Sequence, residues 1–319
     1  MGGADGVRLR RVLRVRRRGG RHARPLVRRR AGVVRLLNAS GCLDALAAPE
    51  VARSLDAFVT KTVTPEPRQG NAPPRIAETD HGMLNAIGLA NPGREVFLAQ
   101  TLPLLGELGS SIWVSVGGFS AGDYAETCAR LPPDDVACVE LNLSCPNVDE
   151  APESAAEIVA ACRRETSLQL YAKLSPHAWD IGETVRAVEA AGADGISLVN
   201  TLRGLALSSR LAPALARGAG GYSGAALKPV ALAAVHAARC ATSLPIVGMG
   251  GVVSGRDALE LVACGANDVA LGTVLFVDPD SPIRVRGELE IAAHDAGHAS
   301  PDDAFGAAHG TVAHSANGR

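Results

Sequence analysis

Short apolar runs alternate with helix-like segments from about residue 33 onward, and this alternation limits the folds that the chain can adopt. The runs have the length of buried β-strands, and the segments between them have the length and apolar spacing of α-helices. Eight strands that alternate with helices over about 260 residues match the size of one (β/α)8 TIM barrel. The predicted strands are 33–38, 57–61, 112–116, 137–143, 170–174, 195–199, 244–248 and 268–271. The predicted helices are 48–55, 94–108, 121–131, 153–164, 181–191, 228–241, 255–263 and 283–293.

A doubly wound open sheet is the alternative architecture for the same alternation. Such a sheet would carry a glycine-rich turn directly after its first strand. Here the first strand is followed by Ala-Ser-Gly-Cys at 39–42, and the glycine-rich loops come late in the chain. The sequence therefore predicts an α/β barrel over residues 36–295. Two long irregular segments, 62–92 and 203–224, are of the kind that forms lids or partner surfaces on the catalytic face.

The two ends of the chain differ from the barrel in composition. Residues 1–35 contain 13 arginines and one acidic residue, Asp5. The rest of the chain keeps 19 of the 32 basic and 32 of the 33 acidic residues, a net charge of −13. A basic arm can bind nucleic acid or an anionic membrane surface. This one has almost no aromatic or periodic apolar content and no apolar core of a secretory signal, so we predict a disordered arm. A second disordered segment is predicted over 296–319.

The composition also excludes several classes of protein. No apolar run approaches the roughly 18 residues needed to cross a bilayer. Aromatic residues make up 3% of the chain, which argues against a stacking platform for single-stranded nucleic acid. The seven cysteines are scattered, without the close pairs that hold zinc or an iron–sulfur cluster, which indicates free thiols in the cytoplasm. We predict no metal site, and the late histidines are not spaced like one: His294, His298, His309 and His314.

Polar residues close most of the predicted strands, and in a barrel these strand ends meet on one face. Two of the three lysines of the chain, Lys61 and Lys173, lie at such ends. A lysine at the end of an apolar strand needs an anion or a polar partner to offset its desolvation. The third, Lys228, opens a helix beside a proline, and we expect a structural role for it. The other polar strand ends are Thr62, Asn142, Asn147, Asn200 and Thr201.

One strand end carries a thiol. The strand 137–143 runs directly into Ser-Cys-Pro-Asn, so that Cys145 follows it closely. Cys145 is a candidate base or nucleophile, and the amides of Asn142 and Asn147 can orient a planar polar ligand. The other interpretation is a buried thiol beside a turn, which is the common state of an isolated cysteine.

Glycine-rich ends follow the last two strands, where barrels commonly bind a phosphate. Gly250 and Gly251 follow the seventh strand, and Gly272 and Thr273 follow the eighth. Their backbone N–H groups can approach an anion closely. Tight turns would explain any one of these glycines equally well. Because both pairs occur at the expected strands, the sequence favours a phosphorylated ligand.

Eight stretches of the chain resemble dihydroorotate dehydrogenases, in order, over about residues 38–290. They are KTVTPEPRQGN (61–71), PRIAETDHGMLNAIGLANPG (74–93), ELNLSCPN (140–147), AKLSP (172–176), GADGISLVNT (192–201), GYSGAALKP (221–229), PIVGMGGV (245–252) and LGT (271–273). The resemblance implies an FMN-binding barrel that oxidises dihydroorotate to orotate in pyrimidine (UMP) biosynthesis. Cys145 stands where class 1 enzymes have their base, whereas class 2 enzymes have a serine and an N-terminal membrane helix. The stretch MLNAIGLANPG is closer to class 1B than to class 1A.

The resemblance also implies a role for each site residue. Cys145 would take the C5 proton of dihydroorotate, and FMN would take the C6 hydride. Ser115 stands where the family presents an asparagine to FMN, so we expect that contact to be weakened or replaced. The implied substrate-binding residues are Lys61, Asn85, Ala86, Ile87, Gly88, Leu89, Asn142, Asn147, Asn200 and Thr201. The implied FMN-binding residues are Ser40, Lys61, Thr62, Asn142, Lys173, Val199, Gly224, Gly250, Gly251, Gly272 and Thr273.

Class 1B enzymes pass electrons to a second subunit that carries FAD and a [2Fe–2S] cluster, with NAD as the final acceptor. The scattered cysteines of this chain cannot hold that cluster. We therefore predict a homodimer with a separate electron-transfer subunit. Two alternatives remain: another FMN barrel such as a tRNA dihydrouridine synthase, for which an arginine-rich arm would be natural, and a nucleic-acid-binding protein that acts through residues 1–35. The asparagines at 85, 142, 147 and 200 suit a small free pyrimidine acid and favour dihydroorotate.

Overall fold

The computed structural model describes residues 34–143, 154–177 and 180–310. Eight parallel strands close into a barrel in the order β1-β12-β11-β8-β7-β6-β5-β2, which confirms the predicted barrel over the open sheet. The barrel strands are β1 (Leu36–Asn38), β2 (Ala57–Val59), β5 (Ser111–Val116), β6 (Cys138–Asn142), β7 (Gln169–Lys173), β8 (Gly195–Leu198), β11 (Ile246–Met249) and β12 (Asp268–Leu271). All eight overlap the predicted strands.

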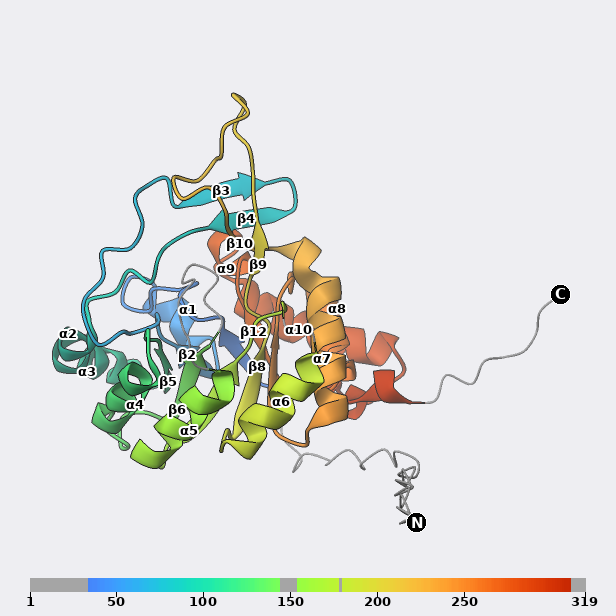
Figure 1. The fold of residues 1–319 in the computed structure, drawn as a ribbon. Helices are drawn as coiled ribbons and strands as arrows, with labels where there is room; N and C mark the ends of the chain where they lie inside the picture. Colours follow the sequence, from blue (N-terminus) through green and yellow to red (C-terminus); the bar gives the residue numbers. More distant parts are fainter. Residues whose placement is uncertain (1–33, 144–153, 178–179, 311–319) are drawn as a thin grey trace, which may run out of the picture.

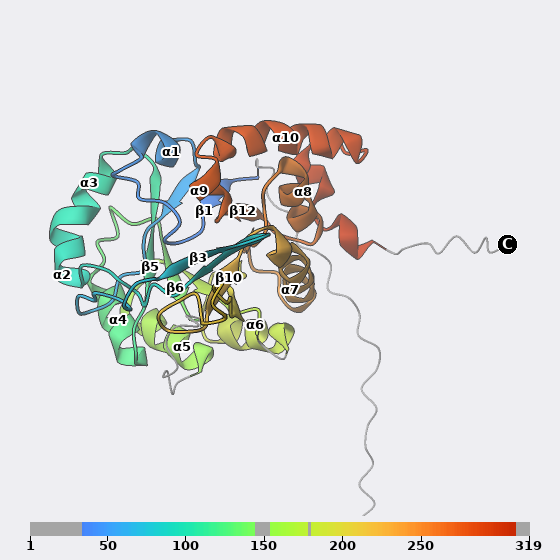
Figure 2. The same ribbon diagram turned by 90° about the horizontal axis from the view of Figure 1, so that it is seen from above.

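The helices form a ring around the barrel (Figure 2). They include α1 (Pro49–Arg53), α4 (Ala121–Arg130), α5 (Ala155–Glu165), α6 (Ile181–Ala190), α7 (Lys228–Ala241), α8 (Gly255–Ala263) and α10 (Ser281–Asp295). The helix predicted over 94–108 is divided into α2 (Arg94–Val96), the π-helix η1 (Phe97–Thr101) and α3 (Leu102–Gly106). Pro103 has no N–H for the carbonyl four residues earlier, which accounts for an irregularity at this point. The short helix α9 (Val274–Val277) was not predicted.

Side chains alternate between the two faces of each barrel strand, so the buried apolar residues form two layers. Side chains of one face fill the inside of the barrel, and those of the other face pack beneath the helices. The inner cluster consists of Leu37, Ala57, Val59, Trp113, Cys138, Tyr171, Val247, Met249 and Ala270. A residue two positions after an inner residue also faces inward, one level closer to the carboxyl end. Lys61, two residues after Val59, and Lys173, two residues after Tyr171, therefore face into the mouth of the barrel.

A second sheet of four antiparallel strands lies across the mouth of the barrel (Figure 1). Its order is β3 (Ile76–Thr79), β4 (Gly82–Asn85), β10 (Gly220–Ser223) and β9 (Leu202–Gly204). The sequence predicted irregular structure for most of both segments. They lack a clear apolar alternation because this sheet buries only a small cluster of its own, Leu84, Ala86 and Leu215.

Both predicted termini require a correction at their inner boundary. Arg35, assigned to the basic arm, belongs to the barrel: its guanidinium donates to both carboxylate oxygens of Asp268, at 3.2 and 2.7 Å. Residues 1–33 and 311–319 lie outside the described residues. Within the segment predicted to be disordered from 296 onward, the described residues 296–310 instead contain two short 3-10 helices, η3 (Pro301–Ala304) and η4 (Ala307–His309). Ala304 is buried there, and the N–H of Gly306 donates to the carbonyl of Val262 on α8.

None of the helices in the described residues is long and apolar enough to cross a membrane.

Helices α8 and α10 pack closely at Gly255, which gives a test of the fold. A Cβ added at Gly255 would collide with the backbone of Glu288 and Leu289. We expect Gly255→Ala to lower the free energy of unfolding by about 1–3 kcal/mol, because the two helices must separate. Urea denaturation measures the change. Gly287→Ala on α10 is the matched control, since nothing lies within 4 Å of its added Cβ. An equal loss in both variants would contradict the close packing.

Candidate active site

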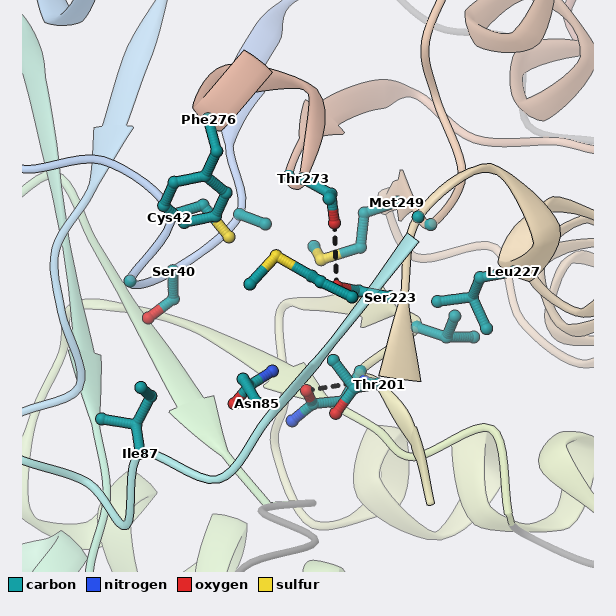
Figure 3. A pocket seen from close by; sticks show the side chains of 18 of the residues that line it. Ser40, Cys42, Asn85, Ile87, Thr201, Ser223, Leu227, Met249, Thr273 and Phe276 are labelled. Atoms are coloured by element: carbon teal, nitrogen blue, oxygen red, sulfur yellow. Dashed lines mark hydrogen bonds between the residues drawn. The ribbon is translucent and has the colours of Figure 1, made fainter. Parts of the chain in front are cut away.

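A cavity of about 270 Å³ opens at the carboxyl ends of the barrel strands, beneath the second sheet. At or just after the strand ends, the barrel contributes Ala39, Lys61, Asn142, Lys173, Val199, Met249 and Gly272. The second sheet contributes Ile76, Met83, Asn85 and Ser223. Figure 3 shows Asn85 and Thr201 on one side of the cavity and Cys42, Thr273 and Phe276 on the other. The cavity is therefore enclosed by both sheets.

Nearly all the site residues named from the sequence and described by the structure line this one cavity. They are Ser40, Lys61, Thr62, Asn85, Ile87, Gly88, Leu89, Asn142, Lys173, Val199, Asn200, Thr201, Gly224, Gly250, Gly251, Gly272 and Thr273. Ala86 is the exception: its side chain is buried with Leu84 and Leu215 in the core of the second sheet. Cys145 and Asn147 lie outside the described residues, so their roles stay predictions.

Two lysines bring positive charge to the cavity. Lys173 is 5% exposed, and its Nζ donates to Oε1 of the equally buried Glu140 at 3.3 Å. The ammonium of Lys61 lies above Gly41, where an added Cβ would be 3.3 Å from Nζ. Burial raises the pKa of the Cys42 thiol, and the charges of Lys173 and Lys61 partly oppose that rise. Both ammonium groups therefore act on the same part of the cavity, which suits an electron-rich ligand.

A chain of hydrogen bonds fixes the amide groups. Asn142 donates its Nδ2 hydrogen to Oγ1 of Thr62 at 3.1 Å, and Asn200 donates to Oδ1 of Asn142 at 3.2 Å. The hydroxyl of Thr62 also lies 3.0 Å from that of Ser115 and 3.4 Å from that of Ser40. Ser115 is fully buried and is not part of the cavity lining, and its hydroxyl reaches the site through that of Thr62.

The glycine-rich end presents backbone instead of side chains. Gly250 and Gly251 have φ values of 120° and 77°, and a Cβ at Gly251 would lie 2.5 Å from the backbone nitrogen of Lys228. On the far side, Oγ1 of Thr273 donates to Oγ of Ser223 at 2.8 Å and ties the end of β12 to the second sheet (Figure 3). The arrangement leaves N–H groups and small hydroxyls for an anion.

An ion pair holds the start of α8 directly after this glycine pair. Nζ of Lys228 lies 2.6 Å from Oδ1 of Asp257, and Oδ2 of the same carboxylate accepts from the N–H groups of Val253 and Ser254. Burial alone would raise the pKa of Asp257, but hydrogen bonds from the Lys228 ammonium, the Val253 N–H and the Ser254 hydroxyl lower it overall. Lys228 therefore has a structural role, as the sequence predicted: it supports the start of α8 beside the glycine pair.

The sequence missed the apolar wall of the cavity. Met249 could have been found, since it follows Val247 by two positions on the inner face of β11. Phe276 is 56% exposed at the rim and sits on the unpredicted helix α9. Two further missed residues belong to short helices, Leu227 to η2 (Ala225–Leu227) and Val274 to α9, and the others come from the second sheet or the loops: Ala39, Gly41, Cys42, Ile76, Met83, Ser223, Val252 and Val253. With this wall, the cavity suits a planar ring with polar edges that carries an anionic group.

Comparison with known proteins agrees with this geometry. The family model for dihydroorotate dehydrogenase matches residues 34–292. Three curated relatives are each named dihydroorotate dehydrogenase B (NAD(+)), catalytic subunit. The protein from Latilactobacillus sakei is 48% identical over 236 residues, 70% of this chain and 77% of the relative. That from Listeria welshimeri is 44% identical over 255 residues (77% and 84%), and that from Trichlorobacter lovleyi is 42% identical over 265 residues (80% and 87%).

A solved structure supports the fold. The dihydroorotate dehydrogenase of Eimeria tenella, in complex with ferulenol, superposes with a TM-score of 0.72 at 22% identity, covering 86% of this chain and 85% of that one. The matched family model covers the barrel and its cavity. The chain belongs to the dihydroorotate dehydrogenase family.

Proposed function

We propose that this chain oxidises dihydroorotate to orotate with FMN, as the catalytic subunit of a class 1B enzyme of pyrimidine biosynthesis. The observation that carries the proposal is the convergence of two lysines, three asparagines and two glycine-rich strand ends on one cavity. The names of the curated relatives supply the substrate, and the chemistry of the lining suits it.

The lining fits FMN. The backbone at Gly250 and Gly251 admits no side chain and would hold the phosphate, together with Gly272 and Thr273. Lys173 would place its ammonium at the edge of the ring that becomes negative on reduction. When bound, FMN supplies the two-electron acceptor that amino-acid side chains lack. Ser40, Thr62, Val199 and Gly224 complete the set that would hold the cofactor.

The amide end of the cavity fits the substrate. Asn85, Asn142 and Asn200 offer N–H donors and carbonyl acceptors for a pyrimidine ring, and Thr201 adds a hydroxyl. Lys61 would balance the carboxylate of dihydroorotate. Cys145 would take the proton from C5 as a thiolate. It follows Asn142 by three residues, and three residues span at most about 11 Å, so the sequence keeps it near the amides.

A second subunit completes the proposal. The relatives are named catalytic subunits of an NAD(+) enzyme, which implies another subunit for the transfer of electrons. We assign FAD and the [2Fe–2S] cluster to that subunit, because the cysteines of this chain are scattered. A homodimer of this chain and a cytoplasmic location remain predictions.

Anaerobic addition of dihydroorotate to the purified yellow protein tests the function. The flavin absorbance should bleach, and one orotate should form per flavin reduced. A flavin that stays oxidised in excess dihydroorotate would contradict the proposal. Reduction by NADPH with salt-dependent RNA binding would instead support the tRNA-modifying alternative.

The basic arm should be dispensable for this chemistry. We expect a chain that begins at Val34 to bleach with dihydroorotate at a rate within about twofold of the full chain, because every described residue of the cavity lies after it. The truncation must retain Arg35, whose guanidinium pairs with Asp268. Stopped-flow absorbance measures the rate, and a loss of bleaching in a folded, yellow truncated protein would contradict the prediction.

A further inference from the structure

Three metal-ligating side chains meet outside the cavity. His236 and Cys240 lie four residues apart on α7, which places them on one face of the helix. His309 of η4 joins them from the C-terminal segment, and the candidate ligand atoms of the three all lie within 4.8 Å of one another. The pair is near the carboxyl end of α7, and α7 returns the chain from the mouth of the barrel to its opposite end. The cluster is therefore separate from the active site.

One distance within the cluster, that between Cys240 and His309, matches the spacing of two ligands on one metal ion. Sγ of Cys240 lies 3.6 Å from Nδ1 of His309. In a tetrahedral zinc site with Zn–S near 2.3 Å and Zn–N near 2.0–2.1 Å, a sulfur and a nitrogen are about 3.6 Å apart. The rings of His236 and His309 are stacked, with centroids 3.9 Å apart and planes 6° from parallel. Because the lone pair of an imidazole lies in the plane of its ring, one of the two rings must turn out of this stack for both to bind the same ion.

A backbone contact fixes the tautomer of His309. Its Nε2 lies 2.9 Å from the carbonyl oxygen of Cys264 at the end of α8. A carbonyl only accepts, so Nε2 carries the hydrogen and Nδ1 presents its lone pair toward Cys240. Metal-bound histidines commonly have this arrangement, in which the second ring nitrogen donates to a carbonyl and orients the ring.

We propose that His236, Cys240 and His309 bind one Zn²⁺ ion, with water in the fourth position. One thiolate and two imidazoles suit zinc, and the Cys240 thiol releases its proton to solvent on binding. Cys240 is exposed, so solvent can reach the open position. The ion would fasten the C-terminal segment to α7. His309 lies beyond the matched residues 34–292 and His236 and Cys240 lie within them, so the ion would join the matched region to the segment that follows it.

Zinc titration of the chelator-treated, FMN-loaded full chain tests the proposal by calorimetry. We expect one zinc per chain, with at least about tenfold weaker binding in His236→Ala, Cys240→Ser and His309→Ala. His298→Ala, a histidine of the same segment outside the cluster, is the matched control and should bind as the parent does. Bound zinc should also protect Cys240 from alkylation, mapped by mass spectrometry, and raise the unfolding temperature of the parent but not of His309→Ala.

Two results would overturn the site. One is the absence of a stoichiometric zinc; the other is binding that Cys240→Ser leaves unchanged, with no protection of the thiol. Either result would reduce the cluster to a ring stack with a thiol–imidazole hydrogen bond. None of the three residues lines the cavity, so flavin bleaching by dihydroorotate should persist in all three variants, and this inference can fail independently of the proposed function.

Discussion

Replacing Cys145 by alanine is expected to slow the reduction of the flavin by dihydroorotate by 10²-fold or more, while FMN and orotate still bind. Alanine cannot accept the C5 proton, and loss of a positioned general base costs about 10²–10⁴-fold. The amides that would hold the pyrimidine, Asn142 and Asn200, keep their own hydrogen bonds in this variant. Stopped-flow absorbance under anaerobic conditions measures the rate, and orotate titration of the flavin spectrum measures binding.

Cys42 provides the matched control for this experiment. Cys42 lines the cavity together with Lys61 and Lys173, so its thiol also lies near the place where the reaction would occur. Burial raises the pKa of the Cys42 thiol, so it remains protonated at neutral pH and is a poor base. We expect Cys42→Ala to keep a rate within a few-fold of the parent. If the flavin were reduced slowly in Cys42→Ala and at the parent rate in Cys145→Ala, the base would be Cys42 and not Cys145.

The barrel side of the cavity could be predicted because two simple periodicities determine it. Apolar runs located the eight strands, and the period of two along each strand determined which side chains face inward. Lys61 follows the inner residue Val59, and Lys173 follows Tyr171, so the register alone directs both lysines to the mouth. Lysine is rare in this chain, which made the coincidence visible.

The second sheet could not be predicted because its strands depend on partners far away in the sequence. The amide of Asn85 donates to the carbonyl of Gly221, 136 residues later. Each segment alone is rich in glycine and proline and has no apolar alternation, so local patterns indicated only loops. Met83 and Ser223 were missed for this reason. Ala86 was assigned to the substrate pocket through its backbone, and its side chain packs in the core of that sheet.

The termini show the same limit. Arg35 was assigned to the basic arm because arginine dominates that segment. In the fold it pairs with the carboxylate of Asp268, 233 residues later in the chain. His309 was judged by its distance in sequence from other histidines, whereas its neighbour Cys240 lies 69 residues earlier. Composition describes a segment by itself and contains no information about the surface onto which it packs.

Replacing Lys173 by methionine is expected to have two separable effects. The first is on stability: Glu140 is 1% exposed, and removal of the ammonium that faces it breaks a buried ion pair, which typically costs 3–5 kcal/mol. The second is on chemistry: the reduced flavin would lose the cation that we propose balances its charge. Loss of one such positioned group typically costs about 10²–10³-fold in rate. A protein that fails to fold would hide the second effect.

The double variant Lys173→Met with Glu140→Gln separates the two effects. It removes both charges and keeps the volume of both side chains, so we expect most of the lost stability to return, as measured by urea denaturation. The chemical defect should remain, because neither methionine nor glutamine carries a positive charge. FMN content and the rate of bleaching by dihydroorotate report it, with a decrease of about 10²-fold expected in rate or a loss of bound FMN. A stable, yellow double variant that bleaches at the parent rate would assign Lys173 to the support of the barrel and remove it from the redox site.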